Sequence, residues 1–211
     1  MKNKKILFES YEEYKNLQIK KAKKTRVRTR SQSRINRRQW IFNRMEKLGI
    51  KEKTILCIGA RDDSEVIFFR DKGYNALGID LIESNEIIKC DMSKVHEHPY
   101  LKNQKYDIVF VSEALEHCLD FEGFIIGLNL ICKKYFICMG PTYSKIKKMG
   151  GPDQWDCNFQ SFMFSENIKK GKIDNNLLLD AFKEFEIIIS EVHKRGTRLF
   201  FILRRKNIEK A

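Results

Sequence analysis

From residue 54 onward, short apolar runs alternate with segments of helical spacing, and this alternation constrains the fold more than any other feature. TILCI (54–58), NALGID (75–80), EIIKCD (86–91), YDIVFVSE (106–113) and YFICMG (135–140) have the length of strands. DDSEVIFFRDKG (62–73), LDFEGFIIGLNLIC (119–132) and DNNLLLDAFKEF (174–185) have the spacing of helices. Strands that alternate with helices predict a doubly wound α/β fold, in which helices cover both faces of a mostly parallel sheet.

The end of the chain breaks this pattern. Two strand-like runs, FEIIISEV (185–192) and RLFFILRR (198–205), are joined by a short connection that contains Gly196. So short a connection predicts a hairpin, because parallel neighbours need a long crossover. We therefore expect the final strand to run antiparallel to the others.

Composition excludes several classes of protein. The apolar stretches are shorter than the roughly 20 residues that span a bilayer, and the N-terminus lacks the apolar core of a secretory signal. The six cysteines show no CxxC pair and no metal-ligand spacing. We expect buried, reduced thiols, a cytoplasmic location and no membrane partner.

Positive charge is concentrated near the N-terminus. Residues 15–38 contain five lysines, six arginines and no acid, whereas the whole chain has a net charge of +13. Such a segment attracts polyanions, so we expect a nucleic-acid partner, preferably RNA. The alternatives are a solvated helix face and a segment that packs its side chains over the domain. Helical patterns at 8–24 and 34–49 predict a basic helical extension (1–50) followed by one domain (51–211).

Acidic side chains follow several of the predicted strands. Asp80, Asp91 and Glu113 come at the ends of successive runs, and Ser112 precedes the last of them. Ligands of doubly wound sheets bind at the carboxyl ends of the strands. Asp80 follows Gly59 by 21 residues, which is the spacing at which a carboxylate accepts from both hydroxyls of a ribose.

Residues 54–140 resemble the class I S-adenosylmethionine-dependent methyltransferases, and among them the methyltransferase type 11 group. The resemblance rests on ILCIGARDDSEV, GYNALGIDL, EIIKCDM and YDIVFVSEALEHCLD, and SYEEYKNLQ (10–18) is similar to the N-terminal segment of a subset of the family. It implies a Rossmann-like seven-stranded sheet of order 3-2-1-4-5-7-6 with strand 7 antiparallel. It also implies S-adenosyl-L-methionine as the cofactor.

The resemblance assigns the cofactor-binding residues. It implies that the turn at Gly59, Ala60 and Arg61 contacts the methionine moiety and ribose, that Asp80 holds the ribose, and that Asp91 and Met92 flank the adenine. Leu81, Ser112 and Glu113 complete the expected set. The family usually has an acid at position 57 and a glycine at position 61, where this chain has Cys57 and Arg61. A dinucleotide needs a second glycine in this turn so that its pyrophosphate can approach the backbone. S-adenosylmethionine has no phosphate, so the turn can carry a side chain at position 61.

The motif EALEH supplies the candidate catalytic residues Glu113 and His117. It is similar to motifs of quinone O-methyltransferases and of enzymes that methylate the 3′-terminal ribose of small RNAs. In the second group such residues hold Mg²⁺, and Glu113, Glu116 and His117 could do so here if they converge. Because the same motif is widespread without a metal, we expect none.

Candidate acceptor-binding residues lie in two basic segments. The loop GPTYSKIKKMGGPDQWDCNF (140–159) combines aromatic and cationic side chains, which suit stacking on a base and contact with phosphate. We expect a role for Tyr143, Lys145, Trp155 and Asp156 from this loop, and for Arg28, Arg30 and Arg34 from the extension. Alternatively, Trp155 and Phe159 pin the loop onto the core.

The sequence therefore predicts an S-adenosylmethionine-dependent methyltransferase whose acceptor is a nucleic acid, with RNA favoured. A lid formed by the second predicted helix, with Trp40 over the cofactor, is compatible with that function. Two other functions stay open. One is a methyltransferase for a small molecule or glycan, with the extension serving only as a lid or as a protein contact. The other is a non-catalytic nucleic-acid-binding protein on a methyltransferase scaffold.

Overall fold

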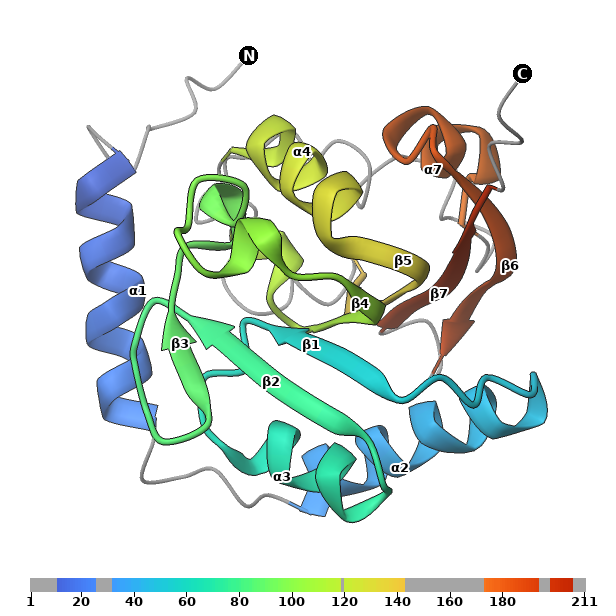
Figure 1. Ribbon diagram of the computed structural model, residues 1–211, viewed down its shortest axis with the longest axis horizontal. Coiled ribbons are helices and arrows are strands. Elements are labelled where there is room, and N and C mark those ends of the chain that lie inside the picture. Colours follow the sequence, from blue (N-terminus) through green and yellow to red (C-terminus); the bar gives the residue numbers. More distant parts are fainter. Residues whose placement is uncertain (1–10, 26–31, 119, 143–172, 194–197, 207–211) are drawn as a thin grey trace.

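A computed structural model describes residues 11–25, 32–118, 120–142, 173–193 and 198–206 of the chain (Figure 1). Its centre is a seven-stranded sheet of order β3-β2-β1-β4-β5-β7-β6. Strands β1 to β5 run parallel, and β7 runs antiparallel to both of its neighbours. The predicted sheet order and the predicted terminal hairpin are confirmed.

The observed strands follow the apolar runs of the sequence. They are β1 (Thr54–Ile58), β2 (Asn75–Asp80), β3 (Ile87–Lys89), β4 (Tyr106–Ser112), β5 (Cys132–Pro141), β6 (Phe185–His193) and β7 (Arg198–Arg205). The main helices are α1 (Tyr11–Thr25), α2 (Gln32–Lys47), α3 (Ser64–Asp71), α4 (Phe121–Ile131) and α7 (Asn175–Ala181). Short 3₁₀ turns follow β3 and β4, namely η2 (Met92–Lys94) and η4 (Leu115–His117), and η3 (Leu101–Asn103) precedes β4.

Two hydrophobic clusters cover the two faces of the sheet. On one face, α4 and α7 pack their apolar residues, such as Phe124, Leu128 and Leu178, against β4 and β5 (Figure 1). On the other face, α2 and α3 contribute residues such as Met45 and Phe69. Both faces of the central strands are therefore buried, as a parallel sheet requires.

Helix α2 belongs to the core of the domain, although its sequence was assigned to the extension. Ile41 and Met45 are fully buried in the same cluster as Ile55 of β1. Trp40 packs edge-on against Phe200 of β7, with ring centroids 4.9 Å apart. The lid that the sequence suggested, with Trp40 over the cofactor, is therefore wrong, because this ring is held against the sheet.

Helix α1 stands at the carboxyl ends of the first strands, beside β3 (Figure 1). Tyr14 and Gln18, which are four residues apart and so share one face of the helix, are 3% and 9% exposed. No helix in the described parts of the chain is long and apolar enough to span a membrane.

Candidate functional site

A pocket lies at the carboxyl ends of β1, β2 and β4, where doubly wound sheets bind their ligands. Its wall contains most of the predicted cofactor-binding residues, namely Gly59, Arg61, Asp80, Leu81, Asp91, Met92 and Glu113, and the predicted catalytic residue His117. Ala60 and Ser112 lie outside the wall that the described residues form. Ala60 instead packs into the core on the α2–α3 face.

The turn after β1 needs the glycine at its first position. Gly59 has a φ of 71°, in the region that favours glycine. A Cβ at this position would lie 2.3 Å from Cβ of Ala114, which follows β4. The amides of Gly59 and Ala60 both donate to the carbonyl of Ile79, at 2.8 and 3.2 Å. The backbones that end β1 and β4 therefore approach each other closely, and the turn is tied to β2.

The backbone conformation of Arg61 is one that favours glycine, the usual residue at this position. Its φ is 52°, a left-handed conformation that a side chain disfavours by about 1–2 kcal/mol. In this conformation its amide donates to Oδ2 of Asp80 at 2.9 Å. The chain thus keeps the backbone geometry of the turn at some cost in strain.

Asp80 lies at the end of β2 as an oriented carboxylate. The amides of Arg61, Leu81 and Ile82 hydrogen-bond to it, and burial raises the pKa of its carboxyl in spite of these bonds. A carboxylate fixed at the pocket wall can accept hydrogen bonds from two neighbouring hydroxyls, and a ribose offers such a pair.

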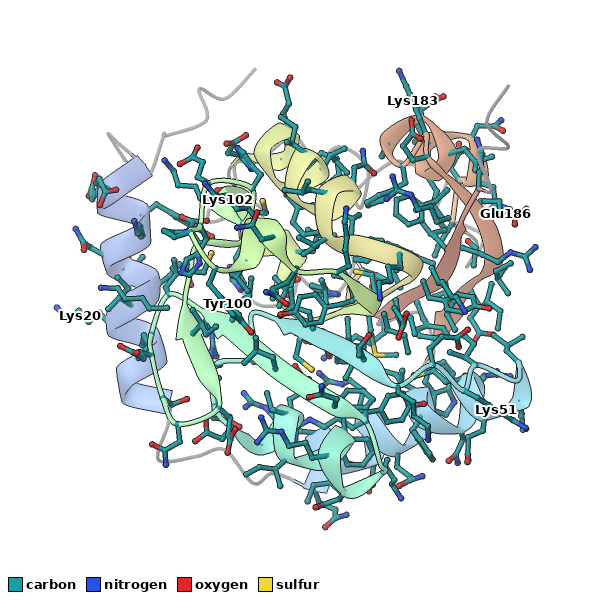
Figure 2. All side chains as sticks on the ribbon, in the orientation of Figure 1. Lys20, Lys51, Tyr100, Lys102, Lys183 and Glu186 are labelled. Atoms are coloured by element: carbon teal, nitrogen blue, oxygen red, sulfur yellow. The ribbon has the colours of Figure 1, made fainter. Side chains whose placement is uncertain are left out.

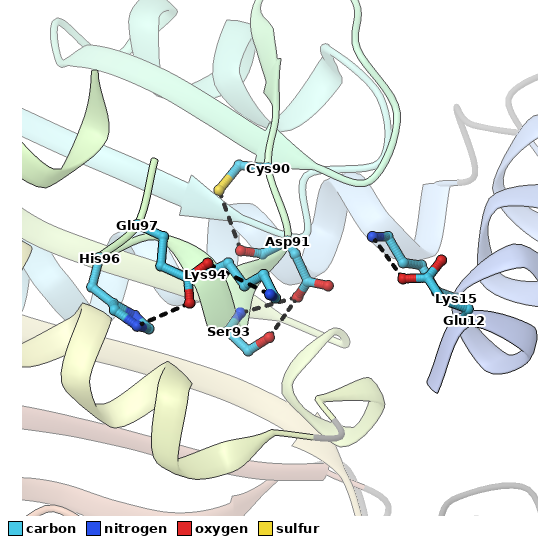
Figure 3. Close-up of polar contacts among 8 residues, drawn as sticks. All are labelled: Glu12, Lys15, Cys90, Asp91, Ser93, Lys94, His96 and Glu97. Atoms are coloured by element: carbon cyan, nitrogen blue, oxygen red, sulfur yellow. Dashed lines mark hydrogen bonds and ion pairs between the residues drawn. The ribbon is translucent and has the colours of Figure 1, made fainter. Parts of the chain in front are cut away.

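Asp91 follows β3 and closes the next part of the wall (Figure 3). Its Oδ1 accepts from the amide and the hydroxyl of Ser93, at 3.1 and 2.8 Å. These bonds cap the η2 turn and fix the direction of the carboxylate. Cys90, its neighbour, donates its thiol to the Asp91 carbonyl at 3.2 Å and also lines the pocket.

Glu113, at the end of β4, is held by two arginines from distant elements. Its φ is 56°. It pairs with Arg198 of β7 and, at 3.6 Å, with Arg37 of α2. Burial raises the pKa of its carboxyl, whereas both arginines lower it. Glu116, beneath it, is 3% exposed, and burial together with the charge of Glu113 raises its pKa to about 8.

His117 is contacted by helix α1, which the sequence analysis did not assign to the site. The hydroxyl of Tyr14 lies 3.1 Å from Nδ1 of His117, and Tyr14, Lys15 and Gln18 all line the pocket. The signal in the sequence is SYEEYKNLQ, whose resemblance to the N-terminal segment of a subset of the family does not by itself assign these residues to the pocket. The pocket also includes Cys118 and Ala114 from the turn after β4.

Nothing among the described residues forms a group of three or more His, Cys, Asp or Glu side chains that could hold a metal ion. Glu116 is buried and does not appear in the pocket wall. The three residues that could have bound Mg²⁺ therefore do not converge on one point of the pocket.

The predicted acceptor residues are only partly placed. Arg34 lies on α2, where its guanidinium pairs with Asp62 at 3.5 Å. The other predicted residues lie outside the described parts of the chain, namely Arg28, Arg30, Tyr143, Lys145, Trp155 and Asp156.

Comparison with known proteins finds no matching family model and no matching curated protein. Solved structures do match. A 1,6-didemethyltoxoflavin-N1-methyltransferase from Burkholderia thailandensis, with bound 1,6-didemethyltoxoflavin and S-adenosylhomocysteine, matches with a TM-score of 0.63 and 15% identity over 95% of this chain and 92% of that one.

Two other methyltransferases match at similar identity. The N-methyltransferase NodS from Bradyrhizobium japonicum, in complex with S-adenosylhomocysteine, has a TM-score of 0.55 and 8% identity over 85% of this chain and 90% of its own. Magnesium protoporphyrin IX methyltransferase from Synechocystis, with bound S-adenosylhomocysteine, has a TM-score of 0.51 and 16% identity, covering 82% and 84%. At identities this low, a structural match is evidence about the fold alone. The three matches and the sheet order show that this chain has the fold of the class I S-adenosylmethionine-dependent methyltransferases.

Proposed function

We propose that this protein is an S-adenosylmethionine-dependent methyltransferase. The observation that carries the proposal is the Asp80 carboxylate, which the amide of Arg61 orients at 2.9 Å beside the bare turn at Gly59. A ribose would bind Asp80, with the rest of the nucleoside toward Asp91 and Met92 and the methionine moiety along Gly59. The carboxylates of Asp80 and Asp91, together with the turn at Gly59, a residue that has no side chain, fit this cofactor.

When bound, the cofactor supplies a methyl group that is electrophilic because it is attached to a sulfonium. The residues of this chain have the simpler task of orienting an acceptor and excluding water. Tyr14, Lys15 and Gln18 of α1 contribute to the side of the pocket opposite the strand ends, and so shield it from solvent.

His117 is the group best placed to accept a proton from an acceptor. It lines the pocket, and the Tyr14 hydroxyl, 3.1 Å from its Nδ1, orients the ring. Imidazole is the commonest general base in enzymes because it titrates near neutral pH. Glu113 shares the same turn and wall, and it completes the predicted catalytic pair.

The proposed acceptor is a nucleic acid, with RNA favoured. The support is the density of charge in residues 15–38, where five lysines and six arginines occur without an acid. Lys20 is exposed and points away from the domain (Figure 2). Cations in such positions can bind phosphates with a strong dependence on salt.

A small-molecule acceptor is the second candidate, and a specific observation favours it. Arg34, Arg37 and Arg38 pair with acids of the domain, so part of the basic segment is already neutralised. The toxoflavin and porphyrin methyltransferases that share the fold also act, by their names, on small molecules. A non-catalytic nucleic-acid-binding protein is the third candidate.

Two measurements separate these candidates. Titration calorimetry with S-adenosylhomocysteine tests the cofactor site, and Asp80→Ala should weaken binding at least tenfold, or ~1.4 kcal/mol. Fluorescence anisotropy with a single-stranded RNA across a salt series tests the acceptor. Neutralising Arg26, Arg28 and Arg30 should flatten the salt dependence, and replacing Lys51, Lys102 and Lys183, which lie outside the basic segment (Figure 2), should not.

Each outcome points to one candidate. Cofactor binding with salt-sensitive RNA binding supports the proposal. Cofactor binding without RNA binding supports a small-molecule acceptor. RNA binding without cofactor binding supports the non-catalytic protein, and unchanged affinity in Asp80→Ala contradicts the role of Asp80.

A further inference from the structure

Three arginines share one face of α2, and each pairs with an acid, one of which lines the pocket while the other two lie in the segment that follows β1. Residues 34, 37 and 38 have the spacing i, i+3, i+4, which aligns side chains on a helix. Arg34 pairs with Asp62 at 3.5 Å, Arg37 with Glu113 at 3.6 Å, and Arg38 with Glu65 at 3.6 Å. These acids belong to the turn after β1, the end of β4 and the first turn of α3.

Two of these pairs hold the segment between β1 and α3. Asp62 accepts from the amide of Ser64 at 2.9 Å, which shapes the entry into α3. Arg38 donates to the carbonyl of Ser64 at 3.2 Å and also pairs with Glu65, which is 5% exposed. Arg34 therefore holds the residue two positions before Ser64, and Arg38 holds Ser64 itself and the residue after it.

The third pair acts on the pocket itself. Glu113 lines the pocket with a left-handed backbone, and Arg37 approaches it from α2 while Arg198 approaches from β7. The side chain of Arg37 is 13% exposed, and that of Arg198 is 10% exposed. Pairs this well shielded are weakened little by salt, unlike charges on an exposed arm.

We infer that α2 is a positioning element of the cofactor pocket, in which Arg37 acts through Glu113 while Arg34 and Arg38 fix the turn between β1 and α3. This inference rests on the proposed function, because it assigns residues to the same pocket. It also gives the basic segment two parts. The arginines of α2 serve the domain, and residues before Arg34 remain for a polyanion.

The role of Arg37 is electrostatic as well as geometric. Burial raises the pKa of the Glu113 carboxyl, and Arg37, Arg198 and Arg34 oppose that rise. Glu116, a neighbouring carboxyl, is itself kept protonated to higher pH by burial and by Glu113. Removing Arg37 should therefore raise the pKa of Glu113 further, and any step that needs its ionised form should then require a higher pH.

A double-mutant cycle on cofactor affinity tests whether Arg37 acts through Glu113. The full-length chain, Arg37→Met, Glu113→Gln and the double variant are titrated with S-adenosylhomocysteine by calorimetry at several pH values. Circular dichroism and thermal unfolding confirm that each variant is folded. If Arg37→Met does not fold, Arg37→Gln takes its place in the cycle.

Arg44→Met is the matched control. It removes an arginine of the same helix, whose partner Glu191 lies on β6 at 3.2 Å and away from the pocket. It should change thermal stability by an amount typical of a half-exposed ion pair and leave the affinity unchanged. Arg37→Lys keeps the charge and should restore a large part of the affinity that Arg37→Met loses.

The inference predicts that each single variant weakens binding by about tenfold and that the double variant is no weaker than the poorer single, since coupled residues are not additive. Effects that multiply to about a hundredfold, or an unchanged affinity in Arg37→Met, would overturn it. Absence of binding in the folded unmodified chain would refute the proposed function, and the inference with it.

Discussion

Tyr14 and His117 are 103 positions apart in the sequence, yet the Tyr14 hydroxyl lies 3.1 Å from Nδ1 of His117. The contact joins the N-terminal helix to the turn after β4. It places a residue from the extension inside the candidate site, next to the imidazole most suited to proton transfer. The extension is therefore part of the pocket and does more than carry charge.

Replacing Tyr14 by Phe tests this contact. The variant keeps the ring and loses one partly buried hydrogen bond, which is worth about 1 kcal/mol. We expect S-adenosylhomocysteine to bind more weakly, by at most about fivefold, the factor that corresponds to that energy. Tyr100→Phe, at a side chain that is 51% exposed, should have no effect in the same calorimetric titration. Equal affinities in both variants would remove the Tyr14–His117 contact from the binding site.

The glycine of the first turn can be tested against a second glycine of the same backbone conformation. Gly59 and Gly49 have φ values of 71° and 69°, but an added Cβ meets Ala114 only at Gly59 and finds nothing within 4 Å at Gly49. Both alanine variants should lose about 1 kcal/mol to the left-handed backbone. Gly59→Ala should lose roughly 1–3 kcal/mol more through overpacking.

Urea denaturation measures both losses, and calorimetry measures cofactor binding. We expect binding to be lost in Gly59→Ala and kept in Gly49→Ala. Similar unfolding free energies for the two variants would mean that the approach of the β1 and β4 ends is looser than the structure shows.

Arg61→Gly tests the strain in the same turn. Relief of the left-handed conformation gains about 1–2 kcal/mol, and the greater freedom of glycine in the unfolded chain costs about 0.4–1 kcal/mol. The free energy of unfolding should therefore stay the same or rise by up to about 1.6 kcal/mol. Cofactor affinity should be retained, because the bond to Asp80 comes from the backbone amide. Arg61→Val, which is β-branched, should be clearly less stable, and the reverse order in denaturation experiments would contradict the strain.

The sequence predicted the sheet well and the environment of the pocket less well. Apolar runs such as TILCI coincide with β1 because a buried strand requires them, and the short connection before Arg198 forced a hairpin. Arg37 and Arg198 could not be assigned to Glu113, because their pairing depends on how α2 and β7 pack. Tyr14 lies in a segment that resembles the family, but its contact with His117 could not be predicted because the two residues are 103 positions apart.

Burial gives the stability of the protein a dependence on pH that can be measured. Burial and the charge of Glu113 raise the pKa of the Glu116 carboxyl well above its usual range, to about 8. A carboxyl whose pKa is raised by folding stabilises the native state below its unfolded pKa, and this contribution is lost as pH rises through the folded pKa. We therefore expect the free energy of unfolding to fall between about pH 5 and pH 8, by an amount on the order of a few kcal/mol.

Glu116→Gln should flatten this dependence, because its side chain stays neutral. Glu65, whose pKa is raised to about 7 by burial, would keep part of the slope. Glu97→Gln, at a side chain that is 58% exposed, should leave the slope unchanged. Urea denaturation from pH 5 to pH 8 provides the measurement, and equal slopes for the unmodified protein and Glu116→Gln would show that Glu116 is already ionised at low pH.

The most direct test of the account is calorimetric titration of the folded, purified protein with S-adenosylmethionine and, separately, with S-adenosylhomocysteine. The account predicts saturable one-site binding in the micromolar range, about −8 kcal/mol, which Asp80→Ala weakens at least tenfold. Absence of binding by either compound, in protein whose fold circular dichroism confirms, would contradict the proposal that this pocket is a cofactor site.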